Sequence, residues 1–300
     1  MERISLTSTG PEFSRIALGM WRLNTWNLNT DQLVGFLEEA IEMGFTTFDH
    51  ADIYGDYTCE EIFGRALKEK PELRQKMELV SKCGIKLISE TRPKNRFHGY
   101  DTSKEHILAS VETSLKNLHT NHLDLLLIHR PDPLMNAARV AEAFDELREN
   151  GKVRYFGVSN FTPFQFELLQ SHLHFQLVTN QVEVSVLQMN ALHDGTLDQC
   201  QKIDIRPMAW SPFGGGTLFS GESEREKALR TVLGEIASEH HAAIDQVALA
   251  WLLKHPAGII PVLGTGNLHR IRGAAGALEL ELSRDEWFRI WTASAGQEVP

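Results

Sequence analysis

The sequence contains few cysteines and no cysteine pair of the kind that binds zinc. Three cysteines, Cys59, Cys83 and Cys200, are spread over 300 residues, and no C-x-x-C motif occurs. This number and spacing argue against a disulfide framework and against a zinc site. No metal site is predicted, and the small, odd number of widely spaced cysteines favours a protein of the reducing cytoplasm.

Blocks of basic residues and long apolar runs are also missing. Forty acidic residues against 30 basic ones give a formal charge of −10, so nucleic acid is not expected as a partner. The first 13 residues lack the apolar segment of a secretory signal. The longest apolar run, 247–253, is far too short to cross a bilayer. No membrane association is expected, and a monomer is compatible with the composition.

Short apolar runs alternate with longer amphipathic segments along the chain. The runs predict strands at 16–19, 46–49, 78–82, 123–129, 153–159, 177–181, 205–210 and 258–263. The amphipathic segments predict helices at 31–43, 60–67, 103–118, 136–149, 163–169, 196–202, 225–237 and 244–253. Eight strand–helix units predict an α/β fold, a (β/α)8 TIM barrel, with residues 1–300 as a single domain. Residues 3–16, divided by Gly10-Pro11, predict an N-terminal β-hairpin.

A doubly wound open sheet is the alternative for a chain in which strands and helices alternate. Its nucleotide-binding fingerprint, G-x-G-x-x-G, opens a helix after a strand. The nearest match begins at Gly264 and Gly266, but His269 stands where the third glycine belongs. The failed match favours the barrel.

In a TIM barrel, functional residues gather where the strands end. Asp49, Lys82 and His129 end three consecutive predicted strands, and Tyr54 follows Asp49 by five residues. A nearby ammonium favours phenolate, so Lys82 is predicted to lower the pKa of Tyr54 from its usual ~10. Asp49 would hold the lysine, and His129 can donate a hydrogen bond to a carbonyl oxygen. This set predicts protonation of an oxygen on which negative charge develops.

Several motifs, in order over essentially the whole chain, resemble those of the aldo-keto reductase family. They are the Asp49–Gly55 stretch, Lys82, the Leu-Asp-Leu-Leu-Leu-Ile-His run that ends at His129, Gly157-Val-Ser-Asn-Phe and Asn180-Gln181. Two further runs, Ser81-Lys-Cys-Gly-Ile and Ile128-His-Arg-Pro-Asp-Pro, resemble a short bacterial subgroup, the YdhF-like oxidoreductases. The resemblance implies an enzyme that uses NADPH to reduce a small aldehyde or ketone.

The resemblance also implies a role for individual residues. Tyr54 corresponds to the proton donor, Asp49 and Lys82 to the pair that tunes its pKa, and His129 to the residue that orients the carbonyl. The residues that correspond to the cofactor site are Ser159, Asn160 and Gln181 at the nicotinamide carboxamide, Trp210 stacked on the nicotinamide, Ser211, Phe213 and Gly214 beside the pyrophosphate, and Gly264, Thr265, Gly266 and Arg270 near the 2′-phosphate. Trp21 and Tyr100 are candidates for the substrate pocket.

The residues near 267 support a phosphate site independently of the resemblance. Asn267 is a plausible N-cap of a short helical segment, and the backbone N–H groups of a helix start bind phosphate. The guanidinium of Arg270 suits a phosphate monoester, which favours NADPH over NADH. The sequence departs from the family where many members carry lysine, at Gly264, and where many carry an acid, at Gly273.

Alternative interpretations remain for several of these residues. Lys82 alone fits a Schiff-base aldolase built on the same barrel. The resemblance extends to potassium-channel β-subunits, so a cofactor-binding sensor with slow turnover is a further hypothesis. Trp210 could serve barrel packing alone. Asp52, close to Asp49, is expected to be a solvated loop residue.

Overall fold

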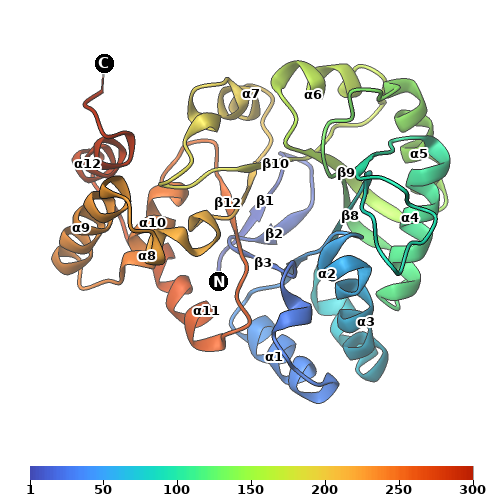
Figure 1. The fold of residues 1–300 in the computed structure, drawn as a ribbon, viewed down its shortest axis with the longest axis horizontal. Coiled ribbons are helices and arrows are strands. Elements are labelled where there is room, and N and C mark those ends of the chain that lie inside the picture. The colour runs from blue at the N-terminus through green and yellow to red at the C-terminus, as the bar shows by residue number, and fades with distance from the viewer. Residues whose placement is uncertain (300) are drawn as a thin grey trace.

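Eight parallel strands form a closed barrel in the computed structural model, which describes residues 1–299 (Figure 1). The barrel strands are β3 (Ala17–Gly19), β4 (Thr47–Asp49), β5 (Glu78–Cys83), β8 (Leu123–Ile128), β9 (Val153–Ser159), β10 (Asn180–Glu183), β11 (Met208–Trp210) and β12 (Ile260–Leu263). They neighbour one another in chain order, and β12 pairs with β3 to close the ring. Each overlaps one predicted strand, so the predicted TIM barrel is confirmed.

Helices surround the barrel (Figure 1). They are α1 (Thr30–Glu42), α2 (Tyr54–Tyr57), α3 (Cys59–Glu69), α4 (Lys104–Asn117), α5 (Ala137–Glu149), α6 (Pro163–Gln170), α7 (Thr196–Lys202), α8 (Thr217–Ser220), α9 (Glu224–Glu239), α10 (Ile244–Leu253), α11 (Leu268–Ala275) and α12 (Arg284–Ala295). Each of the eight helices predicted from spacing matches one of these to within two residues at either end. Helix α3 shows why the spacing works: Phe63 and Leu67 are buried, whereas Glu61 and Arg65 are exposed.

The predicted N-terminal hairpin closes one end of the barrel. Strands β1 (Arg3–Ser5) and β2 (Glu12–Ser14) pair antiparallel. Phe13 is fully buried and belongs to the same apolar cluster as Val80 and Leu125 of the barrel. The Arg3 guanidinium lies 2.7 Å from the Glu78 carboxylate at the start of β5. Because the hairpin covers the amino-terminal ends of the strands, the other end is left for a site.

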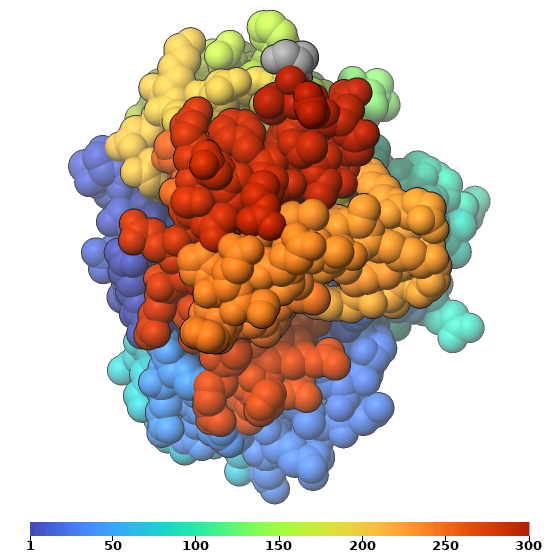
Figure 2. Space-filling model, turned by 90° about the vertical axis from the view of Figure 1, so that its left-hand side faces the viewer, coloured from blue at the N-terminus to red at the C-terminus, as the bar shows by residue number. Residues whose placement is uncertain are grey.

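Two further features lie outside the eight-fold pattern. In the segment after β5, the short strands β6 (Ile85–Lys86) and β7 (Gly99–Tyr100) pair antiparallel. Helix α12 packs against α9, and both lie on the outer surface of one side of the molecule (Figure 2). Within residues 1–299, none of the helices combines the length and the apolar character that a membrane span requires.

Candidate active site

A cavity of about 740 Å³ opens at the carboxyl ends of the strands. The predicted site residues that line it are Trp21, Asp49, Tyr54, His129, Ser159, Asn160, Gln181, Trp210, Ser211, Phe213, Gly264, Thr265 and Arg270. These residues come from distant parts of the sequence, and the barrel brings them together. The strand-end argument therefore located the right face of the molecule.

Lys82 is buried beneath this cavity and connects three groups. Its Nζ donates to Asp49 Oδ2 at 2.7 Å, to the His50 carbonyl oxygen at 2.8 Å and to the Tyr54 hydroxyl oxygen at 3.0 Å. An ammonium has three donors and no acceptor, so the phenol must accept this hydrogen bond. Residues 1–299 provide no acceptor for the phenol's own proton. The Tyr54 proton is therefore free to point into the cavity, which Tyr54 lines.

The electrostatics of Tyr54 differ from the prediction made from the sequence. Burial raises the pKa of the Tyr54 phenol more than Lys82 lowers it, and Asp49 adds to the increase. The prediction that Lys82 makes this phenol unusually acidic is therefore wrong for this structure. Burial also opposes the charged form of Lys82, but Asp49 and Tyr54 together raise its pKa. Tyr54 is thus a protonated phenol beside a charged ammonium.

His129 faces Tyr54 across the same part of the cavity. The two rings meet edge to face with their centroids 5.8 Å apart. Burial, followed by the charges of Lys82 and Arg130, holds the pKa of His129 well below its usual value. The imidazole is therefore neutral and carries a single N–H donor. A neutral imidazole can donate that hydrogen bond to an oxygen which Tyr54 also reaches.

The four residues predicted to surround the nicotinamide form one hydrogen-bonded chain that ends at Asp49. Trp210 Nε1 donates to Asn160 Oδ1 at 3.0 Å, and Asn160 Nδ2 donates to Ser159 Oγ at 2.8 Å. Ser159 Oγ donates to the Gln181 carbonyl at 2.8 Å, and Gln181 Nε2 donates to Asp49 Oδ1 at 2.8 Å. Asn160 has a φ of 61°, a strained backbone conformation that is common at functional sites.

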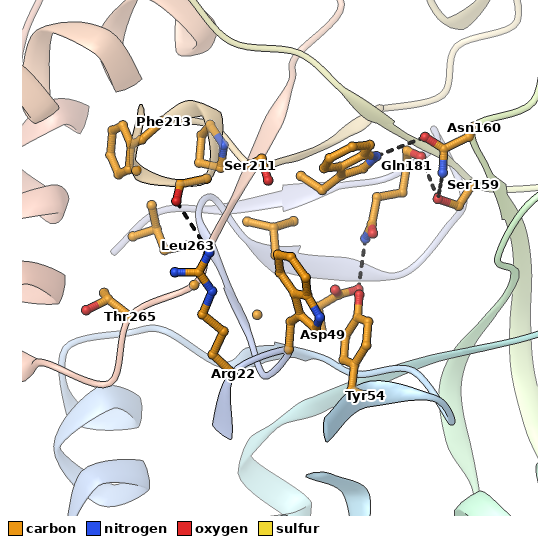
Figure 3. A pocket seen from close by; sticks show the side chains of 18 of the residues that line it. Arg22, Asp49, Tyr54, Ser159, Asn160, Gln181, Ser211, Phe213, Leu263 and Thr265 are labelled. Atoms are coloured by element: carbon orange, nitrogen blue, oxygen red, sulfur yellow. Dashed lines mark hydrogen bonds between the residues drawn. The ribbon is translucent and has the colours of Figure 1, made fainter. Parts of the chain in front are cut away.

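The predicted phosphate-binding residues lie at the other end of the cavity. Figure 3 shows Thr265 far from Ser159, with Asp49 and Tyr54 between them. Asn267 caps α11 as predicted, because its side chain accepts hydrogen bonds from the N–H groups of His269 and Arg270. Arg22 also lines the cavity, and its guanidinium donates a hydrogen bond to the Gly215 carbonyl oxygen at 3.4 Å.

Some predicted site residues do not line the cavity. Tyr100 is exposed on β7, and Gly214 is not part of the lining, although its chain neighbours Phe213 and Gly215 are. Gly266 faces Trp26 instead: a Cβ on this glycine would come within 2.4 Å of the indole. Gly266 therefore serves close packing.

Asp52 is the clearest correction among the neighbouring residues. The sequence predicted a solvated loop residue, but only 8% of Asp52 is exposed. Burial, followed by the nearby Glu60, raises its pKa well above the usual value. Its backbone N–H donates to the Lys82 carbonyl at 3.0 Å, so Asp52 lies directly behind the site.

The structure adds lining residues that the sequence argument missed. Arg130 follows His129 directly, so the rule that strands end at the site could have identified it. Phe219 on α8 and Asp245 on α10 also line the cavity. Both lie within helices, where no strand end marks them, and only the folded structure brings them to the site.

Comparisons with known proteins agree with this geometry. The family model described as the aldo/keto reductase family matches residues 15–294. Oxidoreductase YdhF of Escherichia coli is 52% identical, and a 6-dehydroglucose reductase of Agrobacterium fabrum is 47% identical; each alignment covers 100% of both chains.

A solved structure supports the same relationship. The thermostable aldo-keto reductase Tm1743, crystallised with the inhibitor epalrestat, superposes with a TM-score of 0.82 at 30% sequence identity. The match covers 98% of this chain and 100% of that one. Aldo-keto reductases are oxidoreductases that use nicotinamide cofactors and act on small carbonyl compounds. The chain therefore belongs to the aldo/keto reductase family and is an NAD(P)H-dependent oxidoreductase.

Proposed function

We propose that one barrel domain, residues 1–300, reduces an aldehyde or ketone with NADPH and uses Tyr54 as the proton donor. The observation that carries this proposal is the bonding of Lys82. Its three donors are occupied by Asp49, His50 and Tyr54, which leaves the phenolic proton free on the cavity side. His129 stands beside that proton and has a hydrogen bond to offer.

Each of the four residues has one task in this reaction. When bound, the nicotinamide supplies a hydride to the carbonyl carbon. His129 orients the carbonyl oxygen by a hydrogen bond, and Tyr54 delivers its proton to the same oxygen as negative charge develops there. The ammonium of Lys82, 3.0 Å from the phenolic oxygen, stabilises the phenolate that remains. Asp49 holds the ammonium in place.

The lining of the cavity fits a phosphorylated dinucleotide. Amide and hydroxyl groups of Ser159, Asn160 and Gln181 gather at one end, where a carboxamide would need them. Arg22 and Arg270 line the rest of the cavity, and guanidinium groups suit phosphates. Arg270 with Thr265 favours a cofactor with a 2′-phosphate. One relative bears the name 6-dehydroglucose reductase, which supports carbonyl reduction here.

Replacing Tyr54 by phenylalanine tests the proton donor. General acid catalysis contributes roughly 10²- to 10⁴-fold, so Tyr54→Phe should lower kcat for aldehyde reduction by about that factor. The dissociation constant of NADPH, measured by quenching of tryptophan fluorescence, should stay within about twofold of the wild-type value because the ring remains. Tyr155→Phe, a matched change on β9 outside the cavity lining, should leave both quantities unchanged. A wild-type rate in Tyr54→Phe would refute the assignment.

The geometry argues against an aldolase on the same barrel. A Schiff base requires a neutral lysine amine with access to the substrate. The pKa of Lys82 is raised, and its three hydrogen bonds occupy all of its donors beneath the cavity. Borohydride should therefore trap no substrate on Lys82. The other alternative, a cofactor-binding sensor, would bind NADPH but would reduce none of the aldehydes or ketones tested.

A further inference from the structure

The backbone turn that follows Tyr54 is left-handed over three consecutive residues. Gly55, Asp56 and Tyr57 of α2 have φ values of 58°, 57° and 68°. Glycine adopts such values freely, but a residue with a Cβ does so at a cost, and a bulky residue such as tyrosine is rarely found there. Contacts with other parts of the chain are therefore needed to stabilise this turn.

The chain after β3 and the start of α3 pack closely against Gly55. A Cβ on this glycine would lie 2.5 Å from Cys59 Sγ and 2.9 Å from the Asn24 side chain, so no larger residue fits there. Thr58 Oγ1 donates to the Gly55 carbonyl at 2.6 Å. These contacts restrict the turn at its glycine but do not involve Tyr57.

Tyr57 joins the turn to the segment between β6 and β7. Only 9% of Tyr57 is exposed. The Leu87 backbone N–H donates to the Tyr57 hydroxyl oxygen at 2.9 Å, and Asn95 Nδ2 donates to the same oxygen at 3.4 Å. Asn95 Nδ2 also donates to the Leu87 carbonyl at 3.0 Å. Both ends of the 87–95 segment therefore meet at this one hydroxyl.

Two further contacts lie between these ends. The Arg92 guanidinium lies 4.7 Å from the centroid of the Tyr57 ring, and a cation over an aromatic face is attracted to it. Thr91 Oγ1 donates to the Asp56 carbonyl at 3.3 Å. The 87–95 segment thus contacts both residues of the left-handed turn that carry a Cβ.

We propose that Tyr57 is a positioning residue for carbonyl reduction: it holds the 87–95 segment on the left-handed turn and thereby fixes the backbone next to Tyr54. Lys82, at 3.0 Å, fixes the phenolic oxygen, but the direction of the O–H also depends on the backbone that carries the ring. Among residues 1–299, the cavity lining includes Tyr54 and not Tyr57, so Tyr57 acts through its neighbour. This inference rests on the proposed function, since the group that is positioned is its proton donor.

Replacing Tyr57 by phenylalanine removes the shared acceptor and keeps the ring beneath Arg92. A displacement of about 1 Å can cost roughly 100-fold in rate. For 4-nitrobenzaldehyde with NADPH, kcat should therefore fall by roughly 3- to 30-fold, with KM and the dissociation constant of NADPH within about twofold of wild type. The rate is expressed per NADPH-binding site, counted by fluorescence titration. Tyr155→Phe, which removes a hydroxyl on β9, should match the wild type.

The solvent isotope effect distinguishes positioning from a loss of active molecules. If the phenol is misplaced, proton transfer limits the rate more strongly. The ratio of kcat in H2O to kcat in D2O should therefore increase in Tyr57→Phe. A preparation that only contained fewer active molecules would keep the wild-type ratio, and that result would contradict a positioning role.

Asn95 tests the same connection from the other side. Asn95→Ala removes the amide that joins Leu87 to the Tyr57 hydroxyl, and it changes neither the turn nor the cavity lining. We expect kcat to fall here as well. The double variant should lose less than the product of the two separate factors, because both changes break one connection. Lys94→Met, at an exposed position of the same segment, should match the wild type.

Proteolysis measures the connection without any turnover. Trypsin can cleave after Lys94 and after Arg96, both of which are exposed. A hydrogen bond between neutral groups is worth a change of roughly 2- to 12-fold in an equilibrium, so cleavage at these two positions should be faster by about that factor in Tyr57→Phe.

Unchanged cleavage rates, or a wild-type kcat in Tyr57→Phe, would overturn the inference. A wild type that bound NADPH but reduced no aldehyde would be a different result: the proposed function would fail, whereas the cleavage rates would still show whether Tyr57 holds the segment.

Discussion

Arg270 and Arg272 stand two residues apart on α11 but have different surroundings. Arg270 lines the cavity, whereas Arg272 lies 3.9 Å from Glu39 of α1 and is mostly exposed. If Arg270 binds the 2′-phosphate, Arg270→Met removes a charge-assisted hydrogen bond that NADPH makes and NADH does not. We expect the dissociation constant of NADPH to rise by roughly 10- to 100-fold, with that of NADH nearly unchanged.

The neighbouring arginine provides the control for this prediction. Fluorescence titrations of Arg272→Met with both cofactors should match the wild type, because its exposed ion pair with Glu39 is worth little. Equal weakening of NADPH and NADH in Arg270→Met would contradict a role in recognising the 2′-phosphate.

Individual site residues could be predicted from the sequence where a strand ends, but their electrostatics could not. Asp49, Lys82 and His129 follow buried runs, so their position in the barrel follows from the pattern. The pKa of Tyr54 and the burial of Asp52 depend on segments packed around them. The nearby charge of Glu60, on α3, adds to the raised pKa of Asp52, and nothing in the sequence near Asp52 reveals that the two carboxyl groups are neighbours.

Helices α10 and α12 are joined by a pair of tryptophans. The rings of Trp251 and Trp287 stack with their centroids 4.8 Å apart and their planes at 7°. Each indole N–H donates to the backbone carbonyl of the other residue, at 3.1 and 3.0 Å. This reciprocal arrangement fixes α12 against the helix that precedes β12.

Truncation of Trp287 tests how strongly this pair stabilises the fold. Because the change removes a stacked ring and the hydrogen bond that its indole N–H donates to the Trp251 carbonyl, Trp287→Ala should lower the free energy of unfolding by about 2 to 4 kcal/mol. Trp287→Phe keeps a ring and loses one donor, so it should cost about 1 kcal/mol. Urea denaturation measures both. Neither residue lines the cavity, so a loss of activity in the folded variant would contradict this purely structural role.

The sequence carries a signal for α12 that the barrel pattern does not require. Ser283 and Glu286 form a capping box, since each side chain accepts from the backbone N–H of the other residue. Trp287, Ile290 and Trp291 then follow at helical spacing. The eight strand–helix units are complete before residue 283, so a prediction built on the eight-fold repeat has no place for this helix.

For the whole molecule, buried titratable groups make stability depend on pH in two opposite directions. Burial, with a further effect of Lys82, lowers the pKa of His50 to about 3. The unfolded chain binds that proton near pH 6.5, so His50 favours unfolding as the pH falls from 6.5 to 3. Burial raises the pKa of Asp52 and of Glu60. Their contribution to stability is complete at low pH and is lost as the pH rises through the raised values.

A substitution of His50 measures how much this residue lowers the free energy of unfolding at acidic pH. Its ring lies edge to face on Phe63, with centroids 4.5 Å apart, and both ring nitrogens are buried without a hydrogen-bond partner among residues 1–299. His50→Phe keeps an aromatic ring and the backbone carbonyl that binds Lys82, and it removes the proton from the unfolded chain. At pH 4.5, two units below the unfolded pKa, the variant should gain about 3 kcal/mol relative to wild type, beyond any difference at pH 7.5. Urea denaturation at the two pH values measures this gain.

His98→Phe, at an exposed position in the segment after β5, should show the same change of stability with pH as the wild type. If His50→Phe and the wild type lost the same free energy between pH 7.5 and 4.5, His50 would already accept its proton in the folded molecule.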